Sequence, residues 1–204
     1  VKRVFPDHEM HIHLTSGRVG KNVVIYQNLY PKQNSSLIEL LFVVDLCREL
    51  GAEKISLIIP WFAYSRQDKK WYKTESFSLR TICKLLKKAG ISEVYSFDIH
   101  FHRKPGKFKK FGLTWHNLTA AKAIKDYVEK KYNEKFLVIG PDAGSNEMVK
   151  TVGGVVAFKK RKDCMKCHKP ASMCKCKSKI KDYVIRQEIN EKRITHPYIL
   201  VLDD

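Results

Sequence analysis

The segment Arg66-Gln67-Asp68 places a guanidinium, an amide and a carboxylate side by side, directly after an aromatic turn. The apolar run at 55–59 precedes this turn, and Pro60 would end that strand. A guanidinium can pair with an anionic group, an amide both donates and accepts, and a planar base could lie against the aromatic rings. The segment therefore predicts a site for a flat anionic ligand, although a charged strand-to-helix connection is the simpler interpretation.

Other polar groups suited to phosphate, metal or sugar also follow apolar runs. They are His100, Asp142, the cations Lys159, Lys160 and Arg161, and the carboxylates of Asp203 and Asp204. A neutral imidazole and a carboxylate can hold a divalent cation such as Mg²⁺, which also binds phosphate oxygens. The turn at 141–145 could present backbone N–H groups to phosphate, and adjacent carboxylates suit ribose hydroxyls or a metal ion. Each group alone is a weak signal. A histidine at a strand end, for example, is more often a hydrogen-bonded structural residue than a metal ligand.

Near the start of the chain, Phe5, Asp7 and Glu9 stand at alternate positions. In an extended strand, these three side chains would lie on one side. The ring could then stack on a base, while the carboxylates accept hydrogen bonds from an exocyclic amine or a ribose. An exposed polar edge is an equally good interpretation of this pattern.

The six cysteines fall into two groups. Cys47 and Cys83 lie within helical apolar patterns and are expected to be small core residues. The other four lie in a lysine-rich stretch, within a basic insertion at about 163–178; they are Cys164, Cys167, Cys174 and Cys176. This spacing predicts a structural tetrahedral Zn²⁺ site, with His168 as a substitute ligand, in preference to disulfides.

The elements that must position these groups are short strands alternating with helices. Apolar runs rich in β-branched residues predict buried strands at 23–26, 55–59, 94–97, 136–139, 155–158 and 199–202. Helical patterns begin at a capping box at Ser36, near Phe77, at an Asn117 cap and at Ser145, and glycines such as Gly51 and Gly90 end them. The alternation predicts an α/β fold with parallel sheets, in which ligands gather at the carboxyl ends of strands. We expect two similar units, residues 1–115 and 116–204.

The charge balance indicates a polyanionic ligand, since the net charge is +18. Nucleotides, sugar phosphates and nucleic acid all satisfy this condition. No window approaches a membrane-spanning apolar length and no signal-peptide core is present, so a cytoplasmic protein is expected. The chain begins at Val1 and ends just after an apolar strand, from which we expect a piece of a longer protein.

Taken together, the segments resemble the ribose-phosphate pyrophosphokinase family, in the family's order and at similar spacings. The residues at 5–9 resemble Phe-Pro-Asp-Gly-Glu, and those at 34–41 resemble Asn-Asp-x-Leu-x-Glu-Leu-Leu. The loop at 59–68 is similar to Pro-Tyr-x-x-Tyr-x-Arg-Gln-Asp. Residues 98–100, 116–118 and 141–144 are similar to Asp-Leu-His, Asp-Asn-Leu and Pro-Asp-Ala-Gly.

The resemblance implies two phosphoribosyltransferase-like domains with helices on both sheet faces. It also implies Mg²⁺-dependent transfer of the ATP pyrophosphoryl group to the anomeric hydroxyl of ribose 5-phosphate. By this resemblance, ATP would contact Arg66, Gln67 and Asp68, and also Phe5, Asp7 and Glu9 of an adjacent subunit in a dimer-based homo-oligomer. Mg²⁺ would lie on His100 and Asp142, and the ribose phosphate on Asp203 and Asp204. The family's mobile catalytic Lys-x-Arg would fall on Lys159, Lys160 and Arg161, or one residue later.

Three departures from the family pattern keep other functions open. His8 replaces a glycine, Ser145 replaces the second glycine of Pro-Asp-x-Gly-Gly, and the cysteine-rich insertion interrupts the mobile-loop region. A catalytically weak regulatory or scaffold relative is therefore one alternative. A basic nucleic-acid-binding module is another, disfavoured because the interleaving of aromatic and basic residues is sparse outside 61–72. A type I phosphoribosyltransferase would share the fold and the terminal aspartates, but it has no reason to carry the Arg-Gln-Asp loop.

Overall fold

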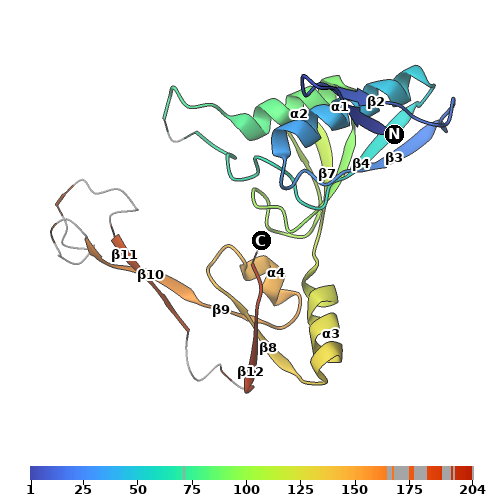
Figure 1. Ribbon diagram of the computed structural model, residues 1–204. Coiled ribbons are helices and arrows are strands. Elements are labelled where there is room, and N and C mark those ends of the chain that lie inside the picture. Colours follow the sequence, from blue (N-terminus) through green and yellow to red (C-terminus); the bar gives the residue numbers. More distant parts are fainter. Residues whose placement is uncertain are drawn as a thin grey trace. The chain divides into compact units, whose positions relative to one another are not determined.

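The computed structural model describes residues 1–70, 72–164, 167, 175–176, 183–189, 194 and 196–203, with backbone only at 158–163 and 183–188. It divides into two compact units, Val1–Leu118 and Thr119–Asp204 (Figure 1). Among the described residues, no helix combines the length and the apolar character that crossing a membrane requires.

The first unit is built on a five-stranded sheet in the order β3-β4-β5-β7-β6. Its strands are β3 Asn22–Tyr26, β4 Lys54–Ile58, β5 Glu93–Phe97, β6 Gly106–Lys110 and β7 Leu113–Leu118. The pairs β3–β4 and β4–β5 are parallel, as the apolar runs predict. Strand β7, which was not predicted, is parallel to β5, whereas β6 is antiparallel to β7. The basic residues before 115 were not among the predicted strands, and they form the β6 strand of this edge hairpin. Phe111 and Gly112 turn the chain with φ of 53° and 82°, as a tight hairpin requires.

Two helices, α1 Gln33–Glu49 and α2 Ser78–Lys88, pack against this sheet. The shared core has fully buried side chains from both helices and three strands; they include Leu40, Val44, Leu79, Leu86, Ile55, Leu57, Val94 and Trp115. Burying each side chain of this size stabilises the fold by about 1.5–3 kcal/mol. Gly51 and Gly90 follow the helices with φ of 97° and 88°, which confirms the predicted glycine stops. The capping box at Ser36 is wrong, because α1 begins three residues earlier, after Lys32.

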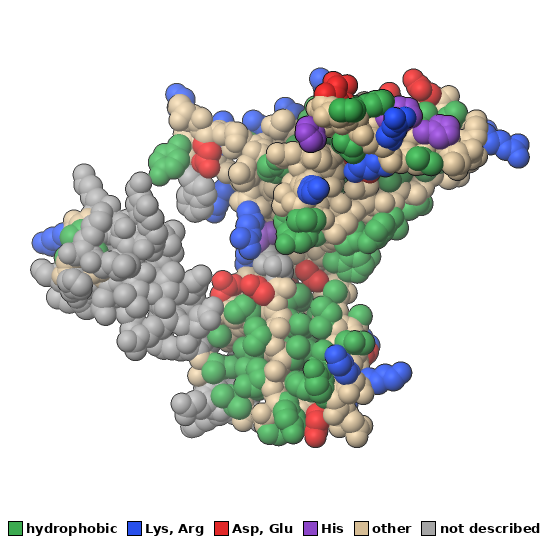
Figure 2. Space-filling view, viewed as in Figure 1, with side chains coloured by type: hydrophobic (Ala, Val, Ile, Leu, Met, Phe, Trp, Pro, Cys, Tyr) green, Lys and Arg blue, Asp and Glu red, His purple; other side chains and the backbone are tan. Residues whose placement is uncertain are grey.

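The second unit holds a parallel three-stranded sheet in the order β12-β8-β9. Its elements are α3 Ala121–Tyr132, β8 Phe136–Gly140, α4 Asn146–Lys150, β9 Val155–Val156 and β12 Tyr198–Val201. A separate antiparallel hairpin joins β10 Phe158–Cys164 and β11 Tyr183–Glu188. The predicted third helix is present as α3, but its predicted start is wrong, because Asn117 lies in β7 and α3 begins at Ala121. Figure 2 shows hydrophobic side chains gathered over β8 and β12, and Ile199 and Val201 are exposed there.

Candidate functional site

A cationic hollow of about 420 Å³ lies in the first unit, at the carboxyl ends of β4 and β5. Its lining residues come from the loops after these two strands; they are Arg66, Asp68, Lys69, His100, Phe101 and Arg103. The loops meet because β4 and β5 are parallel neighbours, with Ile58 paired to Tyr95. Two guanidinium groups and one ammonium face a single carboxylate, so this hollow is suited to an anion such as a nucleotide phosphate.

Two of these cations, Lys69 and Arg103, were not predicted as site residues. Lys69 directly follows the predicted triplet, so its charge and position were a usable signal. Arg103 lies three residues beyond His100, and only the fold of the loop shows that it returns to the hollow.

The loop after β4 is anchored by its aromatic residues. Phe62 is buried and packs edge-on against Trp115, with ring centroids 4.9 Å apart. The Ser65 hydroxyl donates to the Phe62 carbonyl at 2.7 Å, and the backbone N–H of Gln67 donates to the Tyr64 carbonyl at 3.0 Å. The expected stacking of a base on this turn is therefore wrong for Phe62, whose ring belongs to the core. These contacts instead fix the backbone from which Arg66 extends.

The loop after β5 is held by one buried amide, that of Asn117 in β7. The Asn117 Oδ1 accepts a hydrogen bond from the Ile99 amide at 3.0 Å. Its Nδ2 donates to the His102 carbonyl at 2.7 Å and to the Lys104 carbonyl at 3.1 Å. Asn117 is only 2% exposed, so water cannot replace these bonds. This side chain therefore positions the segment that carries His100 and Arg103.

Replacing Asn117 by leucine should lower the free energy of unfolding by about 2–4 kcal/mol, because the buried Ile99 amide and two part-buried carbonyls lose their partner. The same variant should weaken nucleotide binding, since the loop after β5 loses its brace. Urea unfolding and ATP-binding calorimetry measure the two effects.

The matched control is Asn28→Leu, which alters an exposed asparagine with one local contact, the Tyr30 amide at 3.2 Å. This control should change the free energy of unfolding by less than about 0.5 kcal/mol. Equal stability of the Asn117→Leu and Asn28→Leu variants would show that Asn117 does not hold the loop.

His102 lies in the same loop but contributes little positive charge at neutral pH. Burial lowers the pKa of its imidazole below the usual 6.5, and the nearby charges of Lys110 and Lys104 lower it further. The ring stacks on Phe108 with centroids 3.7 Å apart. The positive potential of the hollow therefore comes mainly from its arginines and lysine.

The residues at 5–9 form the turn of a hairpin between β1 Lys2–Val4 and β2 Met10–Ile12. The Phe5 amide donates to the Glu9 carbonyl at 2.9 Å, and Asp7 Oδ1 accepts from the Glu9 amide at 3.1 Å. The expected strand alternation of Phe5, Asp7 and Glu9 is therefore wrong, although all three are exposed. His8 has φ of 71°, a conformation that glycine adopts without strain, which explains the glycine of the resembling motif.

In the second unit, Asp142 follows β8 and Asp203 follows β12. These strands are parallel neighbours, with Val201 paired to Ile139, so both carboxylates follow the same end of the sheet. Asp142 Oδ1 accepts from the Gly144 amide at 2.7 Å, and its carbonyl accepts from the Ser145 hydroxyl at 2.8 Å. The predicted Asp142 thus also braces its own turn, while Asp203 is exposed and Asp204 lies outside the described residues.

The remaining predicted residues belong to the hairpin of the second unit. Lys159, Lys160 and Arg161 lie in β10. At the end of this strand, the sulfurs of Cys164, Cys167 and Cys176 lie within 4.8 Å of one another. Cys174 and His168 lie outside the described residues. Cys47 and Cys83 are buried in the first unit, which confirms their prediction as core residues.

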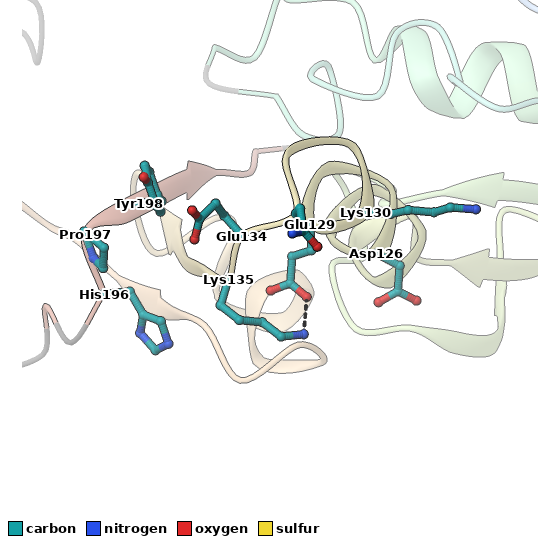
Figure 3. A pocket seen from close by; sticks show the side chains of 9 residues that line it. Asp126, Glu129, Lys130, Glu134, Lys135, His196, Pro197 and Tyr198 are labelled. Atoms are coloured by element: carbon teal, nitrogen blue, oxygen red, sulfur yellow. Dashed lines mark hydrogen bonds and ion pairs between the residues drawn. The ribbon is translucent and has the colours of Figure 1, made fainter.

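A second hollow, of about 540 Å³, lies between α3 and the start of β12 (Figure 3). Its Glu129 accepts hydrogen bonds from Lys135 Nζ at 3.0 Å and from the Phe136 amide at 3.3 Å. These bonds lower the pKa of the Glu129 carboxyl, the Lys135 bond most. None of the predicted site residues lies here, and Glu129 serves to hold the connection from α3 to β8.

Comparison with known proteins identifies one family. Residues 1–90 match the model of the N-terminal domain of ribose phosphate pyrophosphokinase. The ribose-phosphate pyrophosphokinase of Pyrococcus abyssi is 35% identical over 156 residues, which cover 76% of this chain and 52% of that protein. The enzyme of Methanobrevibacter smithii is 29% identical over 152 residues, covering 74% and 50%.

A solved structure gives the same result. The phosphoribosylpyrophosphate synthetase of Mycobacterium smegmatis matches with a TM-score of 0.61 and 26% identity, over 78% of this chain and 54% of that one. The chain spans about half the length of the curated relatives it matches. From the matched domain, the matched structure and the order of the motifs, we conclude that the chain belongs to the ribose-phosphate pyrophosphokinase family.

Proposed function

We propose that the protein containing this chain transfers the pyrophosphoryl group of ATP to the 1-hydroxyl of ribose 5-phosphate. The products are phosphoribosyl pyrophosphate and AMP. The observation that carries this proposal is the hollow in which Arg66 and His100 meet at adjacent strand ends. These are two of the residues that the family resemblance assigns to ATP and Mg²⁺.

Within this proposal, the residues of the first unit bind the nucleotide. Arg66 forms paired hydrogen bonds with phosphate oxygens, while Lys69 and Arg103 add charge to the same hollow. Gln67 and Asp68 contact the remaining parts of ATP. Phe5, Asp7 and Glu9 belong to the adenine site of an adjacent subunit.

Mg²⁺ prefers oxygen ligands and retains several waters, so the Asp142 carboxylate and the phosphate oxygens of ATP suit it, while His100 would add one nitrogen ligand. We propose His100 in the first unit and Asp142 in the second unit each as a Mg²⁺ ligand, as the family resemblance implies. When bound, the ion neutralises charge on the phosphate oxygens. Asp203 and Asp204 orient ribose hydroxyls, and Lys159, Lys160 and Arg161 contact the transferring group. The proposed Zn²⁺ of the cysteine cluster takes no part in this transfer.

The deciding experiment is an AMP-release assay on the full protein with ATP, ribose 5-phosphate and Mg²⁺. AMP should form in proportion to phosphoribosyl pyrophosphate, and formation should require the sugar. Absence of turnover, together with tight association with an active paralogue, would instead establish the regulatory or scaffold function.

Self-association is the proposed quaternary state, and the first unit has a surface suited to it. One face of its sheet is covered by α1 and α2, whereas the opposite face leaves Val24 63% and Tyr26 67% exposed. Tyr95 and His116 stack on that same face at 4.1 Å, and Phe97 and Leu118 are also exposed. Exposed apolar patches of this kind typically mark protein contacts.

Tyr26→Glu should therefore weaken self-association by about tenfold or more, because it places a charge in an apolar contact. Light scattering coupled to size exclusion measures the molar mass against concentration. Tyr72→Glu, at a tyrosine that is 65% exposed in the loop before α2, is the control and should leave the mass unchanged. Identical masses for the wild type and the Tyr26→Glu variant would exclude this face as the contact.

A further inference from the structure

In the described part of the chain, the hairpin that carries the proposed catalytic cations pairs with no other strand. Strands β10 and β11 form a two-stranded sheet of their own, separate from the sheet of β12, β8 and β9. An isolated two-stranded hairpin is only marginally stable in water. Cys164 pairs with Tyr183, so 18 residues connect the two strands, and closing so long a connection costs entropy. A crosslink at this end of the hairpin would therefore help to keep the strands in register.

The cysteine cluster stands at the end of the hairpin where this connection begins. Cys164 is the last residue of β10, and Cys167 and Cys176 lie within the connection. Their sulfurs lie within 4.8 Å of one another, whereas two thiolates on one tetrahedral Zn²⁺ stand about 3.8 Å apart. A small inward movement would therefore place all three on a single ion.

Three cysteines form a donor set typical of a zinc site. Cysteine binds metal as the thiolate, and thiolate ligands select soft or borderline ions such as Zn²⁺. Cys83 is not a candidate ligand, because burial raises the pKa of its thiol to about 12 and keeps it protonated.

We propose that Cys164, Cys167 and Cys176 bind one Zn²⁺ that holds the β10–β11 hairpin closed; the two candidates for a fourth ligand, Cys174 and His168, lie outside the described residues. The ion links the end of β10 to Cys176 and so leaves only residues 177–182 between the crosslink and β11. Lys159, Lys160 and Arg161 lie on the clamped strand, in register with residues 185–187. The metal site is independent of the proposed function, and only the consequence for catalysis rests on it.

Metal content tests the site directly. The full protein, purified without added metal, should retain one equivalent of zinc by elemental mass spectrometry. Cobalt substitution should give the thiolate charge-transfer and tetrahedral d–d bands. Cys167→Ser should lower metal affinity by about 100-fold, whereas Cys47→Ala, which removes a buried thiol of α1, should leave the metal content unchanged. The cobalt spectra of Cys174→Ser and His168→Ala identify the fourth ligand, because only the variant that lacks this ligand should lose intensity.

Hydrogen exchange tests the clamp. Removing the metal should speed exchange of the β10 and β11 amides by about tenfold or more, while the β4 and β5 amides stay protected. Three results would each overturn the site. They are less than one equivalent of zinc in the purified protein, full zinc retention by Cys167→Ser, and cysteines that react with alkylating agents only after reduction, as disulfides do. Unchanged hairpin exchange after metal removal would overturn the clamp. Neither measurement uses turnover, so an inactive protein would contradict the proposed function and leave this inference standing.

Discussion

Arg66→Ala is expected to lower kcat/KM for AMP formation by about 10²–10³-fold, the largest effect of any single change in the first unit. Arg66 lines the hollow together with Lys69 and Arg103, and only a guanidinium presents two parallel N–H donors to a phosphate. Alanine removes both donors and their charge. The neighbouring lysine and arginine would restore part of the potential but not the paired geometry.

Arg66→Lys separates charge from geometry. Lysine keeps the positive charge in the hollow as a point charge, so we expect KM for ATP to rise less than in Arg66→Ala, while kcat remains low. A loss confined to KM in both variants would mean that Arg66 binds ATP equally well in the ground state and the transition state.

Arg80→Ala is the matched control for this series. Arg80 is an exposed arginine of α2 whose guanidinium lies 5.0 Å from the centre of the Phe77 ring, away from the hollow. Its removal lowers the net charge of the first unit by the same amount. If Arg80→Ala reduced kcat/KM as much as Arg66→Ala does, the effect would come from overall charge and not from a specific contact.

The meeting of Arg66 and His100 could be predicted because it depends on a general property of parallel sheets. Residues that follow adjacent parallel strands lie at one edge, whatever the loops do. The apolar runs identified β4 and β5, and the glycines identified the ends of α1 and α2. Local signals of this kind are independent of the rest of the fold.

The errors concern segments whose conformation depends on distant contacts. The residues at 5–9 alternate as a strand would, but a hairpin turn closes there because β1 and β2 pair. Asparagine is a common helix cap, but the Asn117 side chain instead donates hydrogen bonds to the carbonyls of residues 102 and 104. Arg103 joins the site only because of those bonds. Sequence spacing carries no information about such contacts until the sheet order is known.

The cations of β10 give the second large effect, and their substitution also settles which residues match the family's Lys-x-Arg. If the motif falls on residues 159 and 161, Lys159→Ala and Arg161→Ala should each lower kcat by about 10²–10³-fold. Lys160→Ala should then cost less than about tenfold. If the motif lies one residue later, Lys160→Ala and Lys162→Ala become the severe changes and Lys159→Ala the mild one.

Steady-state kinetics with both substrates distinguishes these outcomes from structural damage. Cations that act on the transferring phosphoryl oxygens stabilise charge that develops only in the transition state, so kcat should fall while both KM values change little. Lys150→Ala, which removes a lysine of α4 paired with Glu147 at 3.2 Å, is the control and should keep kcat. Comparable modest losses at all four basic positions of β10 would mean that the strand contributes only diffuse potential. Catalysis would then have to be sought among the cations of the first unit.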